Sequence, residues 1–240
     1  MTNPEVIEDV ADLPTLVRWR RALRALTRVM IHPEETEQVL VFSNLANAKQ
    51  REERMHLFLD HPRGKQLYDE QRTLDSHTID LDALAALPAD TLGHAYATFM
   101  RAHGLTPDVF DGRPADVRDD RAAYVMQRIR QTHDLWHVVT NAETDPAGEV
   151  ALQAFTYAQM NAPSSGILAA LGTLRSLRFT RDVVRDVRDM YRLGKQAEPL
   201  AVFFWEDHWA TPLVDVRRML KLPTHPRPIG GYTAALLEAA

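Results

Sequence analysis

Cysteine is absent from this 240-residue chain. The absence excludes a disulfide scaffold and any metal site built on thiolates, so a bound metal would need nitrogen and oxygen ligands. It also fits a reducing intracellular compartment. Residues 1–12 contain neither the hydrophobic core of a signal peptide nor the arginine-rich amphipathic pattern of a transit peptide. We therefore expect a cytoplasmic protein.

Long apolar runs and an excess of positive charge are also lacking. No run of about 18 apolar residues occurs, so the sequence predicts no transmembrane helix. The formal net charge of −5 leaves no basic surface of the kind that binds nucleic acid. These two absences argue against membrane-spanning and nucleic-acid-binding proteins as function classes.

Alternating polar and apolar residues, which mark β-strands, form no convincing run, whereas apolar residues spaced by three and four recur along the chain. The sequence therefore predicts an all-α fold. With 45% hydrophobic residues, the chain can form a genuine core, and residues 1–224 are predicted to fold as a single helical domain. Residues 225–240 are a predicted tail, because Pro226, Pro228 and the Gly230-Gly231 pair prevent a regular helix.

Four other stretches bear on function. Residues 14–30 place arginines between apolar residues, which favours solvated arginines around a core stripe, with contact to a membrane surface as the alternative. Residues 104–118, rich in proline, glycine and aspartate, predict an ordered loop over a functional site. Residues 167–179 are strongly apolar and either pack in the core or line a lipid pocket. Residues 180–194 alternate arginine and aspartate, which predicts a solvated face.

The pattern with the clearest chemistry is His133-Asp134-x-x-His137. Histidines four residues apart on a helix lie ~40° apart around its axis, one turn above each other, so both imidazoles can bind one ion. Apolar residues on the same face, among them Ile129 and Trp136, predict that the histidines lie in a cleft or in the interior. Asp134 lies at the rim of this face. It is either a fourth ligand or an acceptor that orients a ligating histidine.

Glu149 is the carboxylate that can return to this pair. Asn141 predicts the end of the first helix. Thr144 or Asp145 predicts the cap of a second helix, and the following proline suits its first position. An antiparallel hairpin of the two helices would bring Glu149 to the height of His137. The sequence thus predicts a metal site between the two helices of a hairpin.

The motif and its surroundings resemble a known family, the coenzyme Q biosynthesis protein four family. Its signature resembles His133-Asp134-x-x-His137 followed, after eleven residues, by Glu149. The resemblance extends over about residues 16–222. It includes the Leu-Pro-x-x-Thr-Leu-Gly segment within residues 84–96, the lead-in to the motif at 124–133, the continuation at 148–155, and Trp205-Glu206-x-x-Trp209.

The resemblance implies a role in ubiquinone biosynthesis. The implied reaction is a metal-dependent oxidative decarboxylation, in which a polyprenylated hydroxybenzoate-type ring loses its carboxylate and gains an oxygen at that ring carbon. The resemblance also assigns the metal ligands, and with them the catalytic role, to His133, Asp134, His137 and Glu149. Zn²⁺ suits imidazole and carboxylate ligands, and Fe²⁺, Mn²⁺ and Co²⁺ are compatible with the same ligand types.

Further polar residues are candidates for the substrate side of the site. Arg130 falls on the histidine side of the predicted helix and is expected to hold an anionic group, whereas Arg128 falls on the opposite side. Glu206 and His208 are predicted polar lining residues.

Two other function classes stay open on the sequence alone. A metallohydrolase is one, because the motif is similar to His-Glu-x-x-His, in which the acid activates a metal-bound water. A scaffold or lipid carrier with a structural metal is the other, and a closed four-ligand site would favour it. The expected partners are a prenylated aromatic lipid and other quinone-biosynthesis proteins. Peripheral contact with the inner face of the cell membrane and a homodimer are further expectations.

Overall fold

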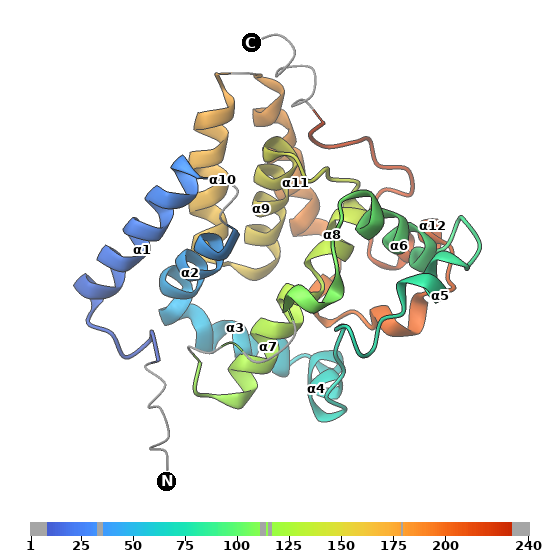
Figure 1. Ribbon diagram of the computed structural model, residues 1–240, viewed down its shortest axis with the longest axis horizontal. Helices are drawn as coiled ribbons and strands as arrows, with labels where there is room; N and C mark the ends of the chain where they lie inside the picture. Colours follow the sequence, from blue (N-terminus) through green and yellow to red (C-terminus); the bar gives the residue numbers. More distant parts are fainter. Residues whose placement is uncertain (1–8, 33–35, 111–113, 115–116, 179, 232–240) are drawn as a thin grey trace.

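The described part of the protein is helical throughout. The computed structural model describes residues 9–32, 36–110, 114, 117–178 and 180–231. Within these ranges the backbone forms α-helices and short 3-10 helices and no strand, only isolated bridges such as Ala142 with Ile229. The predicted all-α single domain is therefore confirmed (Figure 1). Residues 1–8, the expected helix start at 33–35, much of 111–116, residue 179 and the tail 232–240 lie outside the described residues.

The elements follow one another as α1 (Thr15–Ile31), α2 (Thr36–Asn47), η1 (Ala48–Gln50), α3 (Arg51–Leu59), α4 (Pro62–Asp69), α5 (Leu81–Ala85), α6 (Leu92–Ala102), η2 (Pro107–Phe110), α7 (Asp120–Gln131), α8 (His133–Thr140), α9 (Pro146–Met160), α10 (Pro163–Ser176), α11 (Asp182–Gln196), η3 (Leu200–Val202), η4 (Trp205–His208) and α12 (Leu213–Met219).

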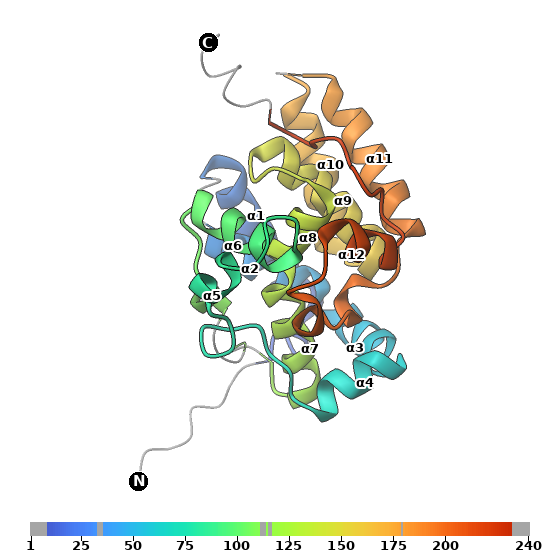
Figure 2. The same cartoon turned by 90° about the vertical axis from the view of Figure 1, so that its right-hand side faces the viewer.

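The helices pack in two groups around separate apolar clusters. α9 packs against α10 and α11, α1 packs against α2, and α10 also contacts α2. The larger cluster surrounds α6, α8 and α9, and the smaller lies between α1, α2 and α10. α6 and α12 both contact α8, and Figure 2 shows α12 in front of it. The motif helix α8 is thus enclosed by neighbours.

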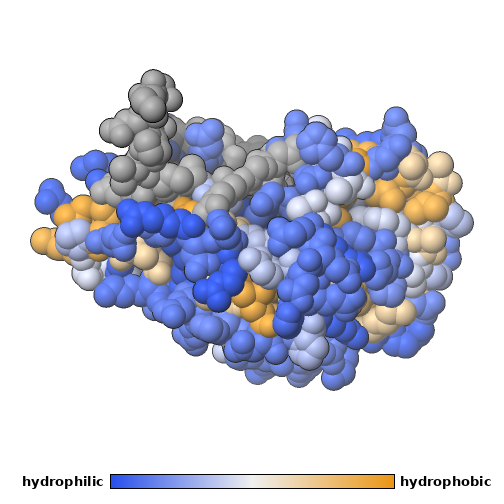
Figure 3. All heavy atoms as spheres, turned by 90° about the horizontal axis from the view of Figure 1, so that it is seen from below, coloured by the Kyte–Doolittle hydropathy of each residue, from blue (hydrophilic) through white to orange (hydrophobic). Residues whose placement is uncertain are grey.

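Apolar side chains are only partly gathered in these clusters. The face in Figure 3 is mainly hydrophilic, with separate apolar areas near its two ends. On α1, Leu16, Leu23 and Ile31 are exposed. Among the described residues, no helix combines the length and the apolar character needed to cross a membrane.

Proline positions set the bounds of several short helices. α3 ends at Leu59, and Pro62 begins α4, which His61 caps by accepting from the Arg63 amide. Pro199 and Pro212 divide residues 198–222 into short elements, because proline removes the amide that a helix interior requires.

The predicted solvated face of α11 contains one buried acid. Asp186 is 0% exposed, and its carboxylate accepts from Arg227 at 2.7 Å. The partner lies 41 residues away in the expected tail, where no local pattern indicates it. Ile229 is also buried, and its amide donates to the Asn141 carbonyl at 3.0 Å. The domain boundary at residue 224 stays a prediction.

Arg217 anchors the end of the motif helix. Its guanidinium donates to the carbonyls of Val138 and Val139, both at 3.0 Å, and of Thr224 at 3.2 Å. The first two belong to the last turn of α8, whose carbonyls have no partner within the helix. A cation at a helix C-terminus is also favourable to the helix dipole. Arg217 therefore holds α8 and the segment after α12 together.

We predict that Arg217→Met lowers the free energy of unfolding by about 3 kcal/mol, because it leaves partly buried carbonyls without a donor. Urea denaturation followed by circular dichroism measures the change. Arg218→Met is the matched control, since Arg218 is exposed and pairs with nearby Asp215. Equal losses in the two variants would contradict the anchoring role.

Candidate metal centre

A tight turn joins the two helices that carry the motif. Asn141 ends α8 in the left-handed conformation, with φ 58° and ψ 38°, which a short polar side chain tolerates. Asp145 caps α9 by accepting from the Gly148 amide at 2.9 Å, and Pro146 is the first helical residue. The predicted break is confirmed, with Asp145 rather than Thr144 as the cap.

This turn brings three of the predicted ligands together. The Nε2 atoms of His133 and His137 lie 3.3 Å apart. Glu149 places Oε1 3.2 Å from His137 Nε2 and Oε2 3.8 Å from His133 Nε2. A tetrahedral Zn²⁺ with bonds of about 2.0–2.1 Å separates its ligand atoms by about 3.3 Å. The group therefore fits one divalent ion with little rearrangement.

His137 is held in a fixed orientation. Its side chain is 1% exposed, and its Nδ1 lies 3.0 Å from the carbonyl oxygen of Ala142. The carbonyl can only accept, so Nδ1 carries a proton, and Nε2 is the atom that would present a lone pair to a bound metal ion. The ring of Phe99, from α6, stacks on the imidazole with centroids 5.6 Å apart. Neighbouring residues thus prepare His137 as a ligand.

Electrostatics couple His133 and Glu149. Burial alone would raise the pKa of Glu149, but hydrogen bonds and charge from His133 and His137 outweigh it and hold the pKa well below its usual range. Burial alone would lower the pKa of His133, but the Glu149 carboxylate outweighs it and raises the pKa. Glu149 is therefore anionic, and a metal ion would replace the proton that it shares with His133.

Asp134 lies on α8 beside the group without being part of it. Among the described residues, the group with ligand atoms close enough for one ion contains His133, His137 and Glu149. Burial raises the pKa of Asp134, and its carboxylate also contributes to the raised pKa of Tyr96 on α6. This places Asp134 on the α6 side of the motif helix. Its role as a fourth ligand or as an orienting acceptor stays a prediction.

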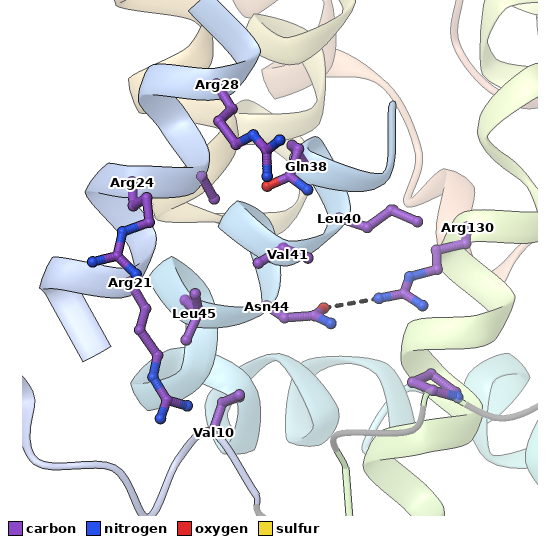
Figure 4. A pocket seen from close by; sticks show the side chains of 12 residues that line it. Val10, Arg21, Arg24, Arg28, Gln38, Leu40, Val41, Asn44, Leu45 and Arg130 are labelled. Carbon is purple, nitrogen blue, oxygen red and sulfur yellow. Dashed lines mark hydrogen bonds between the residues drawn. The ribbon is translucent and has the colours of Figure 1, made fainter. Parts of the chain in front are cut away.

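Arg130, on the helix before the motif, bonds a residue of α2 (Figure 4). Arg130 donates to Asn44 of α2 at 2.8 Å, so its guanidinium is directed toward α2. The prediction assumed one continuous helix, but Thr132 separates α7 from α8 and donates its hydroxyl to the Ile129 carbonyl at 3.2 Å. The side of α7 on which a residue lies therefore does not tell on which side of α8 the histidines lie. The predicted anion-binding role of Arg130 stays a prediction.

Arg128 and Glu206 form a buried pair. The Arg128 side chain is 0% exposed and donates to Glu206 Oε2 at 2.9 Å and to the Phe203 carbonyl at 3.3 Å. Glu206 is therefore the partner of Arg128, and its role as a lining residue stays a prediction. The other predicted lining residue, His208, stacks on Phe203 with ring centroids 4.9 Å apart. The pair of Arg128 and Glu206 links segments 78 residues apart, which local patterns cannot predict.

Two supporting contacts of the site have no signal in the sequence. The acceptor for His137 is a backbone carbonyl, which no side-chain pattern reveals. The stacking of Phe99 on His137 depends on how α6 packs against α8.

The donor set allows an open coordination position. The side chains of His133 and Glu149 are 30% and 39% exposed, so the group can be reached from outside. Three protein ligands leave room in a tetrahedral site for water or a substrate oxygen, which is the arrangement of catalytic rather than structural zinc.

We predict that Gly148→Ala lowers metal affinity at least tenfold. A Cβ at this position would lie 2.2 Å from the carbonyl oxygen of Glu143, so the turn must shift and carry Glu149 with it. Isothermal titration with Zn²⁺ measures the effect. Gly166→Ala is the control, because its Cβ would meet only the Tyr157 ring, at 3.2 Å. Unchanged affinity in Gly148→Ala would show that the turn does not set the ligand geometry.

Comparison with known proteins agrees with the geometry. A family model described as "Coenzyme Q (ubiquinone) biosynthesis protein Coq4" matches residues 9–226. The mitochondrial ubiquinone biosynthesis protein COQ4 of Coprinopsis cinerea is 32% identical over 160 residues, which cover 65% of this chain and 54% of that protein. That of Pyricularia oryzae is 32% identical over 166 residues, covering 69% and 55%. The chain spans about half the length of these relatives.

A solved structure shares the fold. A protein from Nostoc punctiforme, described as a candidate ubiquinone biosynthesis protein, superposes with a TM-score of 0.69 at 25% identity, over 84% of this chain and 96% of that one. The family match covers most of the described residues, including the whole metal group. The chain therefore belongs to the Coq4 family of ubiquinone biosynthesis proteins.

Proposed function

We propose that the protein is a metal-dependent enzyme of ubiquinone biosynthesis that removes the carboxylate from a prenylated hydroxybenzoate-type ring. The observation that carries this proposal is the partly exposed group of two histidines and one glutamate in a member of this family. Loss of carbon dioxide breaks the bond between ring and carboxyl carbon and leaves the electron pair on the ring. Hydroxylation of that carbon would then need an oxidant such as dioxygen.

His133, His137 and Glu149 would hold the metal ion. When bound, Zn²⁺ or a similar divalent ion supplies a Lewis acid that stabilises negative charge on a carboxylate or phenolate oxygen. Neutral imidazoles and a carboxylate are suitable donors for such ions, and the chain has no thiolate to compete. The lowered pKa of Glu149 keeps its carboxylate anionic, so the group retains a negatively charged ligand.

α6 supplies the wall opposite the metal group. Phe99 covers one face of His137, and Tyr96 stacks on Trp209 with centroids 5.6 Å apart. Burial and the nearby Asp134 raise the pKa of Tyr96, so its phenol keeps its proton at neutral pH. These residues would exclude water from one side of a bound aromatic ring and leave the exposed side of His133 and Glu149 as its entrance.

The binding place of the prenyl tail is a separate part of the proposal. Residues 167–179 are one candidate lining, but Ile167, Leu168 and Leu171 pack against the smaller apolar cluster. Phe203 and Trp205 likewise lie in the larger cluster. Core packing, the first interpretation, therefore accounts for these side chains. A tail would have to leave the site along another path or extend into a bilayer.

The ends of α1 and α10 are the proposed membrane contact. Ile31 on α1 and Leu174 on α10 are both 64% exposed, and Leu177 just after α10 is 42% exposed. Arg175 donates to the Met30 carbonyl, so the two helix ends lie side by side. Exposed apolar residues beside arginines suit a peripheral position at an anionic bilayer. Contacts with other quinone-biosynthesis proteins and a homodimer stay predictions.

A non-catalytic scaffold or lipid carrier is the second candidate. A closed site with four protein ligands, for example with Asp134 as the fourth, would favour it. A metallohydrolase is the third candidate, in which Asp134 would have to act as the general base.

Activity on a prenylated hydroxybenzoate in detergent separates the candidates. We predict that the metal-loaded protein converts this compound with loss of carbon dioxide, and mass spectrometry of the product measures the conversion. We also predict that His137→Ala reduces bound metal and product at least tenfold, because it removes one of three ligands. His56→Ala is the control, since His56 is half exposed and lies 3.8 Å from Asp60. Tight lipid binding with stoichiometric metal but no turnover would support the scaffold instead.

A further inference from the structure

The segment after α12 crosses the tip of the hairpin that carries the metal group. Residues 223–231, here called the strap, form no helix, and in Figure 2 this red segment leaves α12 and runs past α11. Ile229 of the strap forms a parallel bridge with Ala142, which lies in the turn between α8 and α9. The Glu143 amide donates to the Ile229 carbonyl at 2.8 Å, and the Ile229 amide donates to the Asn141 carbonyl at 3.0 Å. The strap thus bonds the turn on both sides of Ala142.

One peptide group of the turn joins the strap to a metal ligand. The Ala142 carbonyl and the Glu143 amide belong to the same planar unit and point in opposite directions. The carbonyl lies 3.0 Å from Nδ1 of His137, and the amide donates to the strap at the Ile229 carbonyl. This peptide group cannot follow a shifted strap without changing its bond to His137. The strap therefore determines the direction from which the imidazole is held.

Gly230 brings the strap against the helix that carries the third ligand. Its φ of 87° lies in the left-handed region that favours glycine. A Cβ at this position would lie 2.3 Å from Asp145 Oδ1 and 2.7 Å from the Gly148 amide nitrogen. Asp145 caps α9, and Gly148 directly precedes Glu149. The same strap thus contacts both parts of the chain that supply ligands.

α11 holds the strap in place. Arg227 donates to Asp186 at 2.7 Å and to Asp189 at 3.3 Å. The side chain of Asp186 is 0% exposed, and an ionised carboxylate in the interior is costly without a cationic partner. The side-chain amide of Asn141 adds a bond to the Pro226 carbonyl at 3.1 Å. The strap is therefore attached to α11 at one point and to the hairpin at another.

We propose that the strap positions the metal group, with Arg227, Ile229 and Gly230 as positioning residues, and that a bound ion and the docked strap stabilise each other. The strap keeps the His137 imidazole in its ligating orientation and holds the first turn of α9, which carries Glu149, against the turn. Coupling between two equilibria is reciprocal, so the factor by which the docked strap raises metal affinity is also the factor by which the ion favours docking. The proposal rests on metal binding by the proposed enzyme and not on the reaction that it catalyses.

Gly230→Ala displaces the strap without replacing a ligand. Its methyl group would clash with Asp145 and Gly148, so we expect Zn²⁺ affinity, measured by competition with a chelating dye, to fall about tenfold or more. Gly231→Ala is the matched control. Gly231 has φ 78°, so the control bears similar backbone strain, but its Cβ would meet the Glu143 side chain only at 3.7 Å. The control should bind Zn²⁺ nearly as tightly as the unsubstituted chain.

Two further measurements distinguish positioning from a general loss of stability. Co²⁺ bound to Gly230→Ala should give a changed visible absorption spectrum, because the ligands remain while their directions change. Hydrogen exchange of the Glu143 and Ile229 amides should slow when Zn²⁺ binds, whereas exchange in α1, which packs on α2, should not. Arg227→Gln releases the strap from α11 and should also lower Zn²⁺ affinity, and it decides the outcome if circular dichroism shows that Gly230→Ala does not fold.

Unchanged Zn²⁺ affinity in folded Gly230→Ala, or an equal loss in Gly231→Ala, would overturn the proposal. Exchange of the Glu143 and Ile229 amides that does not respond to Zn²⁺ would overturn it as well. Failure of the proposed function looks different. An unsubstituted chain that binds no Zn²⁺ would refute the metal-dependent function and this proposal with it, whereas normal metal binding with an unaffected variant refutes the role of the strap alone.

Discussion

The close approach of α9 to the turn after α8 is the constraint on which the site depends. Gly148 lies so near the backbone of Glu143 that a Cβ there would come within 2.2 Å of the carbonyl oxygen. Asn141 makes the reversal by adopting φ 58°, and Asp145 fixes the start of the returning helix. Because the return is this short, Glu149 faces the two histidines instead of passing beside them.

Segments far along the chain stabilise this turn from outside. The amide of Glu143 donates to the carbonyl of Ile229 at 2.8 Å, and the amide of Ile229 donates to the Asn141 carbonyl at 3.0 Å. Arg217 binds the last carbonyls of α8 on another side. The described part of the C-terminal segment thus crosses the hairpin at its tip. Substitutions in this segment would shift the backbone of the hairpin and so alter the metal group without replacing a ligand.

The parts of the site that the sequence predicted are those with local signals. The histidine spacing, the terminator Asn141 and the cap before α9 each act within a few residues, so the pattern alone identifies them. The rest depends on packing between distant segments. Arg128 and Glu206 are 78 residues apart, so no local pattern indicates their pairing. The helix break at Thr132 has no signal in the sequence, because no glycine or proline marks it.

X-ray absorption spectroscopy of the metal-loaded protein tests the central claim most directly. The account predicts a divalent ion with two imidazole nitrogens and carboxylate oxygen from His133, His137 and Glu149, together with an oxygen ligand that exchanges with solvent. Spectra without imidazole scattering would contradict the assignment of the site. A closed shell of protein ligands without an exchangeable oxygen would contradict a catalytic role for the metal.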